Sequence, residues 1–478
     1  MVPPAVTRVR ALLAARLGAD PRSLAAFRVG LALAVLADLA VRAGDLRAHY
    51  TDGGVLSRAD ALVLYDFLHA WPLCLHLAGG SVWSQVLFFS IAAAAATAML
   101  VGWRTRPATA VAWLLTSSVQ LRNPYVGAGY DALLRMLLLW GCFLPLGARW
   151  SVDGPGEAGD RPVVSGGSVA LLAQMVLVYV IAGWTKWQIP AWHDGSALGW
   201  ILADDFRVTA TGLRLGAWPE LVRGLGRAVP WVEMAAPLAI VASGGWLRAA
   251  AIAALCALNL AFGLCLEIGL FPWVASVGLV GLLPARAWRR RGGQAASPAG
   301  AHASVRAPDV AAAVILAWVV WWSVEVARSP VFRAPPRVEW FGAALFLQQD
   351  WRMFSEPPSR TGWVVLPGRL ADGTEIDLFA AGGPPPRAKA PVTWQKPPVP
   401  SRIFRNDRWR ALVTRAAYGT RDDRRLLNWS RYLCREWNAA HTGADQLQAF
   451  EVVFLQRRLD TAAPSYEPEP LWTHRCFG

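Results

Sequence analysis

The chain has 478 residues, of which 55% are hydrophobic, and a formal net charge of +14 at pH 7. This hydrophobic share exceeds the roughly 45–50% of soluble domains and predicts a polytopic membrane protein with a polar C-terminal part. The arginines gather in loops and in the C-terminal part rather than along one helix face, so the charge indicates lipid head groups and membrane orientation, not nucleic acid.

Nine apolar segments each predict a transmembrane helix. In chain order they are 24–43, 82–102, 108–122, 130–147, 167–187, 227–243, 247–266, 269–285 and 310–327. Some are shorter than the ~20 residues of an upright span, and the division between the seventh and eighth is open. We therefore expect an all-α membrane domain of about eight or nine spans.

The basic loops predict which side of the membrane each part occupies. With nine spans, the arginines of the N-terminus, of WRTRP and of RAWRRR fall on one side, the cytoplasm. The predicted parts are a cytoplasmic N-terminal segment (1–23), a membrane domain (24–285), a cytoplasmic basic linker (286–309), a last span with its exit (310–334) and an exoplasmic C-terminal domain (335–478).

The C-terminal domain is predicted to be small and α+β. Residues 361–379 read as two strands joined at Asp372-Gly373, 428–440 as a helix and 447–458 as a strand, with a Pro-rich loop over 380–400. Outside the cell Cys434 and Cys476 could form a disulfide. Two free thiols remain the alternative, since the sequence does not give their separation. No Cys/His spacing typical of a metal site occurs.

Charged residues within predicted spans are costly and often mark function. Arg28 and Asp38 in the first span are ~15 Å apart along a helix, too far to pair directly. Asp131 and Arg135 have i,i+4 spacing and could form an ion pair.

The predicted topology places several polar groups in the outer half of the membrane, which predicts a shared polar cavity open to the outside. They are Asp38, Asp131, Arg135, Lys186, Glu233 and Glu267. The alternative is that each is paired or snorkelled separately.

Lysine is rare here: among 47 basic residues only Lys186, Lys389 and Lys396 are lysines. Lys186 ends an apolar segment and is flanked by Trp184 and Trp187, a pattern typical of an interfacial anchor. Burial can also make a lysine a neutral base, whereas arginine stays charged. Both readings stay open.

Six stretches, in order, resemble the horizontally transferred transmembrane (HTTM) domain, the membrane domain of vitamin K-dependent gamma-glutamyl carboxylases and their bacterial relatives. They are FRVGLALAVLADLAVRAGDL, YTDGGVLSR, YDALLRMLLLWGCFLPLGARWSVDG, IAGWTKWQIPAWHDGSAL, EIGLFPWVASVGLVGLLP and QQDWRMFSEPP. The resemblance covers roughly residues 20–290 and reaches WRMFSEPP, 351–358.

The resemblance implies that Lys186 is the base that deprotonates reduced vitamin K, or menaquinol in a bacterium. The oxygenated quinol would then remove a glutamate γ-proton from a peptide or protein, and the carbanion would take up carbon dioxide. On this reading Lys186 and Asp131 are catalytic. The residues expected to bind substrate or cofactor are Arg28, Asp38, Tyr130, Arg135, Trp192, Glu233 and Asn259.

The sequence departs from the carboxylase pattern at two histidines. Gly129-Tyr130-Asp131 stands where the first is expected, and Asn259 where a second is expected. Asp131 or Tyr130 would have to replace the missing partner of Lys186, unless Asp131 instead pairs with Arg135.

Three functions follow from these observations. The first is a quinol-dependent, carboxylase-like enzyme acting on an exoplasmic peptide or protein. The second is a non-carboxylating factor for maturation or export of a secreted peptide, with Lys186 structural. The third is a transporter-like or lipid-binding scaffold. It is the weakest of the three, because the sequence shows no internal inverted repeat of the kind found in many transporters. In each, the protein is expected in the lipid bilayer of a bacterial inner membrane, with its N-terminus in the cytoplasm.

Overall fold

The computed structural model contains a helical part followed by a smaller part built around a β-sheet. It describes residues 15–67, 73–154, 162–288, 306–329, 334–379, 388–419, 423–460 and 465–477. The predicted cytoplasmic segment 1–23 and the predicted basic linker 286–309 fall largely outside these residues.

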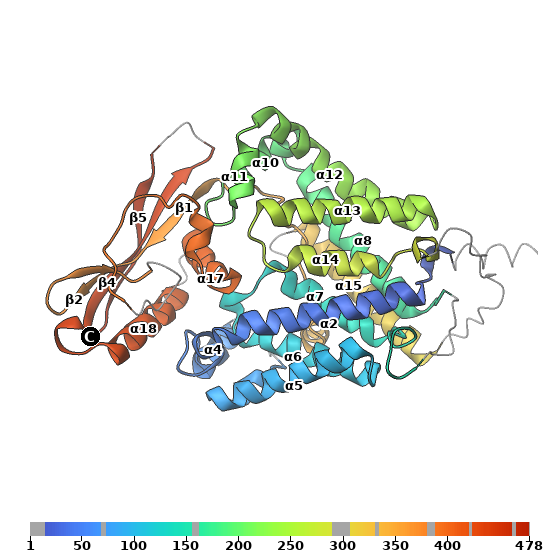
Figure 1. Ribbon diagram of the computed structural model, residues 1–478, viewed down its shortest axis with the longest axis horizontal. Coiled ribbons are helices and arrows are strands. Elements are labelled where there is room, and N and C mark those ends of the chain that lie inside the picture. Colours follow the sequence, from blue (N-terminus) through green and yellow to red (C-terminus); the bar gives the residue numbers. More distant parts are fainter. Residues whose placement is uncertain are drawn as a thin grey trace, which may run out of the picture.

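Among the described residues, six helices are long and apolar enough to cross a membrane. They are α2 (Pro21–Ala43), α5 (Val82–Val101), α8 (Gly166–Trp187), α12 (Pro219–Ala242), α13 (Trp246–Cys265) and α15 (Ala307–Arg328). Each lies on a predicted span. In Figure 1 these helices occupy one side of the molecule and the sheet the other.

Local sequence signals explain where two of these helices begin and end. The side chain of Asp20 caps the start of α2 by accepting from the backbone N–H of Arg22, and Pro21 occupies the first turn. Ser81 caps α5 in the same way, and Gly102 ends it in the left-handed conformation, with φ 78°.

The remaining predicted spans fall on shorter or less apolar helices. These are α6 (Thr105–Arg122), α7 (Gly129–Cys142) and α14 (Phe271–Val280). With 14 residues α7 is only about 21 Å long. Its apolar side chains from Leu133 to Trp140 are buried, because α2, α6, α8 and α14 all pack around it. The number of spans, eight or nine, stays a prediction.

Short helices and turns connect the longer ones. They are α3 (Leu46–Tyr50), α4 (Arg58–Phe67), α9 (Pro190–His193), α10 (Ser196–Leu202), α11 (Ala210–Gly216), α16 (Pro336–Ala344) and the 3-10 turns Leu75–Leu77, Pro124–Val126, Ala285–Trp288, Pro400–Ile403 and Gly443–Asp445.

The C-terminal part combines an antiparallel sheet with two helices. Its elements are β1 (Arg360–Val365), β2 (Pro367–Leu370), β3 (Glu375–Asp377), α17 (Asp407–Tyr418), α18 (Asp423–Ala440), β4 (Leu447–Arg458) and β5 (Glu467–Arg475). The predicted helix at 428–440 and the predicted strand at 447–458 are confirmed. Asp372-Gly373 does make the turn between strands, β2 and β3, but the first predicted strand is divided into β1 and β2.

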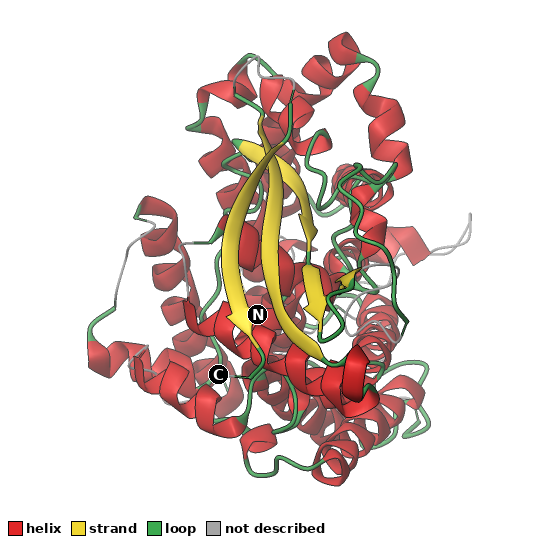
Figure 2. Ribbon diagram, turned by 90° about the vertical axis from the view of Figure 1, so that its left-hand side faces the viewer, coloured by secondary structure: helices red, strands yellow, loops and turns green. Residues whose placement is uncertain are grey.

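Strand β4 is the centre of this sheet. It pairs with β1 and β2 along one edge and with β5 along the other. Figure 2 shows the long strands curving across the molecule. The buried residues Val452 and Phe454 of β4 pack into a core that also contains Trp409 of α17 and Trp429 of α18. Helix α17 lies between the sheet and the membrane helices (Figure 1).

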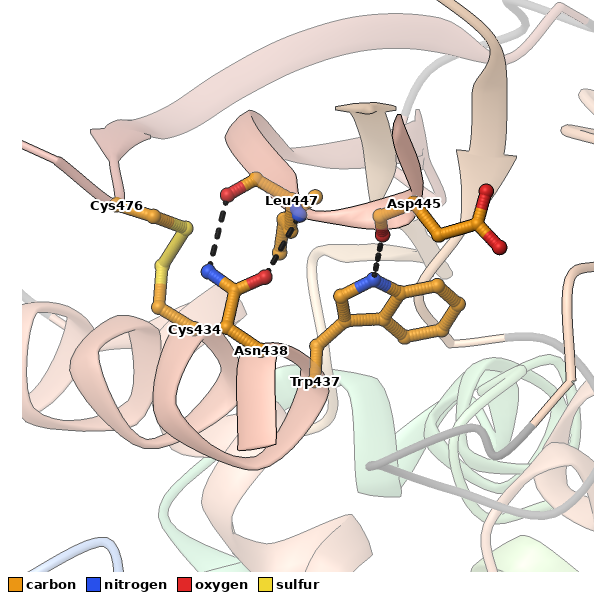
Figure 3. The surroundings of a disulfide bond; sticks show 6 residues. All are labelled: Cys434, Trp437, Asn438, Asp445, Leu447 and Cys476. Atoms are coloured by element: carbon orange, nitrogen blue, oxygen red, sulfur yellow. Dashed lines mark hydrogen bonds between the residues drawn. A yellow bond between two sulfur atoms is a disulfide. The ribbon is translucent and has the colours of Figure 1, made fainter. Parts of the chain in front are cut away.

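A disulfide joins Cys434 in α18 to Cys476, which follows β5 (Figure 3). Next to it, the side-chain amide of Asn438 donates to the carbonyl of Leu447 at 3.1 Å and accepts from the backbone N–H of Leu447 at 2.7 Å. The hydrogen bonds connect α18 to β4, and the disulfide connects it to the end of β5.

Candidate functional site

A cavity of about 620 Å³ lies between the membrane helices and the C-terminal part. One wall comes from α8, α12, α13 and the first residues of α7 and α14. The other comes from residues 353–360 and from α17. A volume of this size is typical of a small-molecule site, for which about 300–1,000 Å³ is usual.

Lys186 and Glu233 form a buried ion pair on the helix wall of this cavity. Lys186 Nζ lies 2.9 Å from Glu233 Oε2 and 3.1 Å from Oε1. Behind the pair, the Trp192 ring centroid is 5.6 Å from Nζ. The indole N–H of Trp192 donates to the carbonyl of Ser355 at 3.0 Å. The lysine is thus enclosed by α8, α12 and the chain that follows the last long helix.

Gly183 allows this pair to form, because it lets α8 approach α12 closely. A Cβ atom at Gly183 would lie 2.8 Å from Met234 Cγ and 3.0 Å from the carbonyl oxygen of Pro230. Lys186 follows Gly183 by three residues and so lies on the same helix face. The close contact of the two helices therefore brings Lys186 to Glu233.

The surroundings of Lys186 differ from those of an interfacial anchor. Lys186 is 1% exposed, whereas Trp184, two residues earlier, is 52% exposed. The lysine therefore points into the protein rather than toward lipid head groups. Its contact with Glu233 gives the ammonium group a carboxylate that can accept its proton.

Neutral polar groups on the same wall could bind a hydroxyl or carbonyl group. Asn259 of α13 and Tyr179 of α8 both line the cavity. The side-chain amide of Asn259 donates to Tyr179 Oη at 2.8 Å and to Ser276 Oγ at 3.4 Å.

A second buried cluster, here called the charge network, lies outside the set of residues that line the cavity. It consists of Asp38 and Arg42 of α2, Tyr50 of α3, Tyr130 and Asp131 of α7, and Arg408 of α17. Arg42 donates to Asp38 at 2.8 Å and to Asp131 at 2.8 Å. Arg408 donates to Asp131 at 2.7 Å and to Asp38 at 2.5 Å.

The charge network is balanced, since two guanidinium groups face two carboxylates. All four of these side chains are at most 6% exposed. Both carboxylate oxygens of Asp131 are occupied: Oδ1 accepts from Arg42, and Oδ2 from Arg408 and from the backbone N–H of Ala128. This geometry fastens α17 to α2 and α7 and leaves Asp131 little capacity for proton transfer.

Further arginines line the cavity, one from the segment between α10 and α11 and another from α17. Arg207 is paired with Asp204 at 2.5 Å. Arg410 of α17 is 9% exposed and makes no side-chain hydrogen bond or ion pair with any described residue. Burial lowers the pKa of Arg410, and the nearby carboxylate of Asp407 only partly offsets this.

Comparison with known proteins identifies the helical part. The sequence model of the HTTM domain matches residues 18–283, which is more than half of the chain. The chain belongs to the HTTM domain family. Neither the comparison with curated proteins nor that with solved structures found a match. The HTTM domain and its apolar helices make the chain an integral membrane protein.

The HTTM domain does not bring all of the predicted site residues together. Lys186, Glu233 and Glu267 line the cavity. Asp38 and Asp131 belong instead to the charge network. The prediction of one shared cavity for all six polar groups was therefore wrong.

Arg135 and Arg28 also lie apart from the cavity lining. The expected ion pair between Asp131 and Arg135 does not form, because Arg135 donates to the carbonyls of Phe346 and Gln348. Arg28 donates to main-chain carbonyls at the opposite end of α2 from Asp38, among them Leu146 at 3.1 Å. Arg28 thus satisfies a backbone oxygen inside the HTTM domain, whereas Arg135 binds backbone oxygens of the chain that follows it.

The described histidines do not replace the partner that the carboxylase pattern would supply, since none of them lines the cavity. His49 is buried against Trp409, with ring centroids 4.3 Å apart. Neither of its ring nitrogens has a hydrogen-bond partner among the described residues. Burial, with the nearby guanidinium groups, lowers the pKa of His49 to about 3.

Several residues of the two clusters were missed from the sequence: Arg42, Tyr179, Asp407, Arg408 and Arg410. Arg42 could have been found, because its i,i+4 spacing from Asp38 puts both on one helix face. Nothing local distinguishes Arg408 or Arg410 from the many solvated arginines of the C-terminal part.

Proposed function

We propose that this HTTM protein is a quinol-dependent membrane enzyme that acts on a peptide or protein, with Lys186 as its base. One observation carries the proposal: the ammonium group of Lys186 is buried, contacts Glu233 and lines a cavity of about 620 Å³. A buried lysine beside a proton acceptor, within a cavity, is the arrangement expected of an acid–base site.

The residues of the cavity fit a quinol head group. Val178, Phe262 and Phe271 offer apolar surface for an aromatic ring, whereas Tyr179 and Asn259 offer groups that can hydrogen-bond a hydroxyl. Reduced vitamin K or menaquinol would supply an ionisable hydroxyl and the reducing equivalents for oxygen chemistry. These residues would hold the ring and exclude water from Lys186.

The ion pair determines how Lys186 can act. An ammonium group has no lone pair, so Lys186 can remove a proton only after its own extra proton has passed to Glu233. The 2.9 Å contact between Nζ and Oε2 supplies the route for that transfer. Glu233 would thus orient the amine and hold the displaced proton.

We also propose that the C-terminal part lies outside a bacterial inner membrane, with the N-terminus in the cytoplasm. The disulfide between Cys434 and Cys476 supports this, because such bonds persist in oxidising compartments. The distribution of basic loops over nine spans leads to the same orientation. A peptide or protein substrate would then reach the cavity from the exoplasmic side.

The test is oxygen uptake by purified protein in nanodiscs supplied with reduced vitamin K or menaquinol. Wild type should consume oxygen, and Lys186→Ala should not. Lys389→Ala is the matched control, since Lys389 is an exposed lysine paired with Asp445 in the C-terminal part. No uptake by folded wild type, or full uptake by Lys186→Ala, would refute the proposal.

A second candidate is a non-carboxylating factor for maturation or export of a secreted peptide. It is favoured by one observation: no histidine is among the described residues that line the cavity. In that case Lys186 and Glu233 would be a structural pair. Peptide processing that continues in Lys186→Ala, without any quinol oxidation, would support this candidate over the first.

A further inference from the structure

Arg410 differs from the other arginines that line the cavity. Arg207 pairs with Asp204, and Arg360 with Glu469 at 3.2 Å. Arg415 donates to the carbonyl of Gly127 at 2.6 Å. Arg410 alone among these has no such partner within the described residues, although it is 9% exposed. No guanidinium nitrogen of Arg410 is a buried atom without a partner in the described part of the chain, so the group faces the cavity. A ligand that supplies an acceptor there gains a charge-assisted hydrogen bond.

An acceptor lies next to this donor. Asp407, three residues before Arg410, also lines the cavity, and its buried Oδ2 atom has no hydrogen-bond partner among the described residues. Because Oδ2 is buried, the carboxylate can meet a ligand in the cavity only through Oδ1. The two charged groups of opposite sign, one turn apart on α17, thus line the same wall.

Arg410 and Asp407 together favour a ligand that carries both a carboxylate and an N–H group. A carboxylate matches the planar fork of a guanidinium, and a neighbouring N–H group matches a free carboxylate oxygen. A phosphate fits less well, because Asp407 and Glu267 both line the cavity and would repel a second negative charge. A peptide carries the required carboxylate and N–H groups close together.

We propose that the C-terminal wall of the cavity is a peptide-recognition site, in which Arg410 binds a carboxylate and Asp407 accepts a main-chain N–H. The inference deepens the proposed function, since it rests on a peptide being the substrate. Binding at this wall needs no quinol and no turnover, so it can be tested separately from the enzymatic step.

The experiment measures peptide binding to the full-length protein in quinol-free nanodiscs. The probes are an end-blocked pentapeptide, Ala-Ala-Glu-Ala-Ala, and its glutamine counterpart, each fluorescently labelled. The glutamate peptide should bind wild type at least about tenfold more tightly than the glutamine peptide, as expected for a hydrogen-bonded charge pair. Arg410→Gln should remove this preference.

The matched control is Arg369→Gln, because Arg369 is an exposed arginine of β2 in the same part of the chain. It should keep the preference for the glutamate peptide. Arg410→Lys keeps the charge but loses the planar fork, so it should bind with an intermediate preference. This variant and the comparison of two peptides on wild type remain informative even if Arg410→Gln fails to fold.

Equal binding of the two peptides to wild type would overturn the inference, as would a preference that survives in Arg410→Gln. Displacement of the glutamate peptide by inorganic phosphate at lower concentration than by acetate would also overturn it, in favour of a phosphate site. Glutamate-specific binding without quinol-dependent oxygen uptake would instead support this site and contradict the proposed enzymatic function.

Discussion

Arg408 Nη1 and Asp131 Oδ2 lie 2.7 Å apart although 277 positions separate the two residues in the chain. The contact connects α17 of the C-terminal part to α7, the buried central helix of the HTTM domain. Because α17 also forms one wall of the cavity, the position of that wall depends on the charge network.

Arg408→Leu should destabilise the protein strongly. It would leave the buried carboxylates of Asp38 and Asp131 with Arg42 as their only guanidinium, and breaking a buried pair costs about 3–5 kcal/mol. Thermal unfolding in detergent, with limited proteolysis of the C-terminal part, measures the effect. Arg405→Leu is the control: Arg405 is 57% exposed and pairs with Asp45, so its loss should cost less than about 1 kcal/mol. Equal stability of the two variants would contradict this account of the network.

Lys186→Met and Glu233→Leu should each destabilise the HTTM domain by about 3 kcal/mol, since each leaves the other charge buried and unpaired. The double variant should lose less than the sum of the two single losses. Unfolding of wild type, the two single variants and the double variant in one detergent gives the coupling energy between Lys186 and Glu233. Strictly additive losses would mean that the 2.9 Å contact contributes nothing to stability.

Acid should destabilise the folded protein through His49. Burial lowers the pKa of His49 to about 3 in the folded protein, whereas the pKa of a histidine in the unfolded chain is about 6.5. The unfolded state therefore binds the extra proton first, and stability falls as the pH drops from about 6.5 toward 3, by about 1.4 kcal/mol per pH unit.

His49→Phe should reduce this loss at pH 5 and change little at pH 8, as measured by unfolding across that pH range. His76, with a pKa also lowered to about 3 by burial, should account for part of the remaining acid sensitivity. His193→Phe serves as the control because His193 is exposed. An unchanged pH profile in His49→Phe would show that His49 is already protonated in the folded protein.

Replacing Cys434 or Cys476 by serine should lower the stability of the C-terminal part by about 2–4 kcal/mol, as expected for a loop that spans 42 positions. Reduction of wild type should have the same effect. Cys142→Ser is the comparison, since Cys142 is free and lies in the HTTM domain. Unfolding with and without a reductant distinguishes loss of the bond from loss of the side chain.

Hydropathy predicted the long apolar helices, because a bilayer demands about 20 apolar residues in succession. It also drew attention to Lys186 and Glu233, since charges are rare in such segments. It could not show that α7, only 14 residues long, is surrounded by protein rather than by lipid. Strand β5 was missed because its sequence, EPEPLWTHR, carries two prolines, which suit an edge strand but not the usual strand pattern.

The charge clusters could not be predicted from local spacing. Asp131 and Arg135 have the spacing of an ion pair, but Asp131 binds Arg42 and Arg408 instead. An i,i+4 pair contributes only about 0.2–0.5 kcal/mol, so better-placed partners from other helices easily replace it. Such partners are brought in by tertiary packing, which the sequence of one helix does not contain.

The charge network also implies an order of events during biosynthesis. Because the chain emerges from its N-terminus, Asp38, Arg42 and Asp131 are made well before Arg408. A nascent chain that ends before Arg408 carries one guanidinium against two carboxylates and must keep that surplus negative charge hydrated. The second wall of the cavity is complete only once α17 docks, because α17 follows both the HTTM helices and residues 353–360 in the chain. A prematurely terminated product would thus be inserted in the membrane and still lack a closed site.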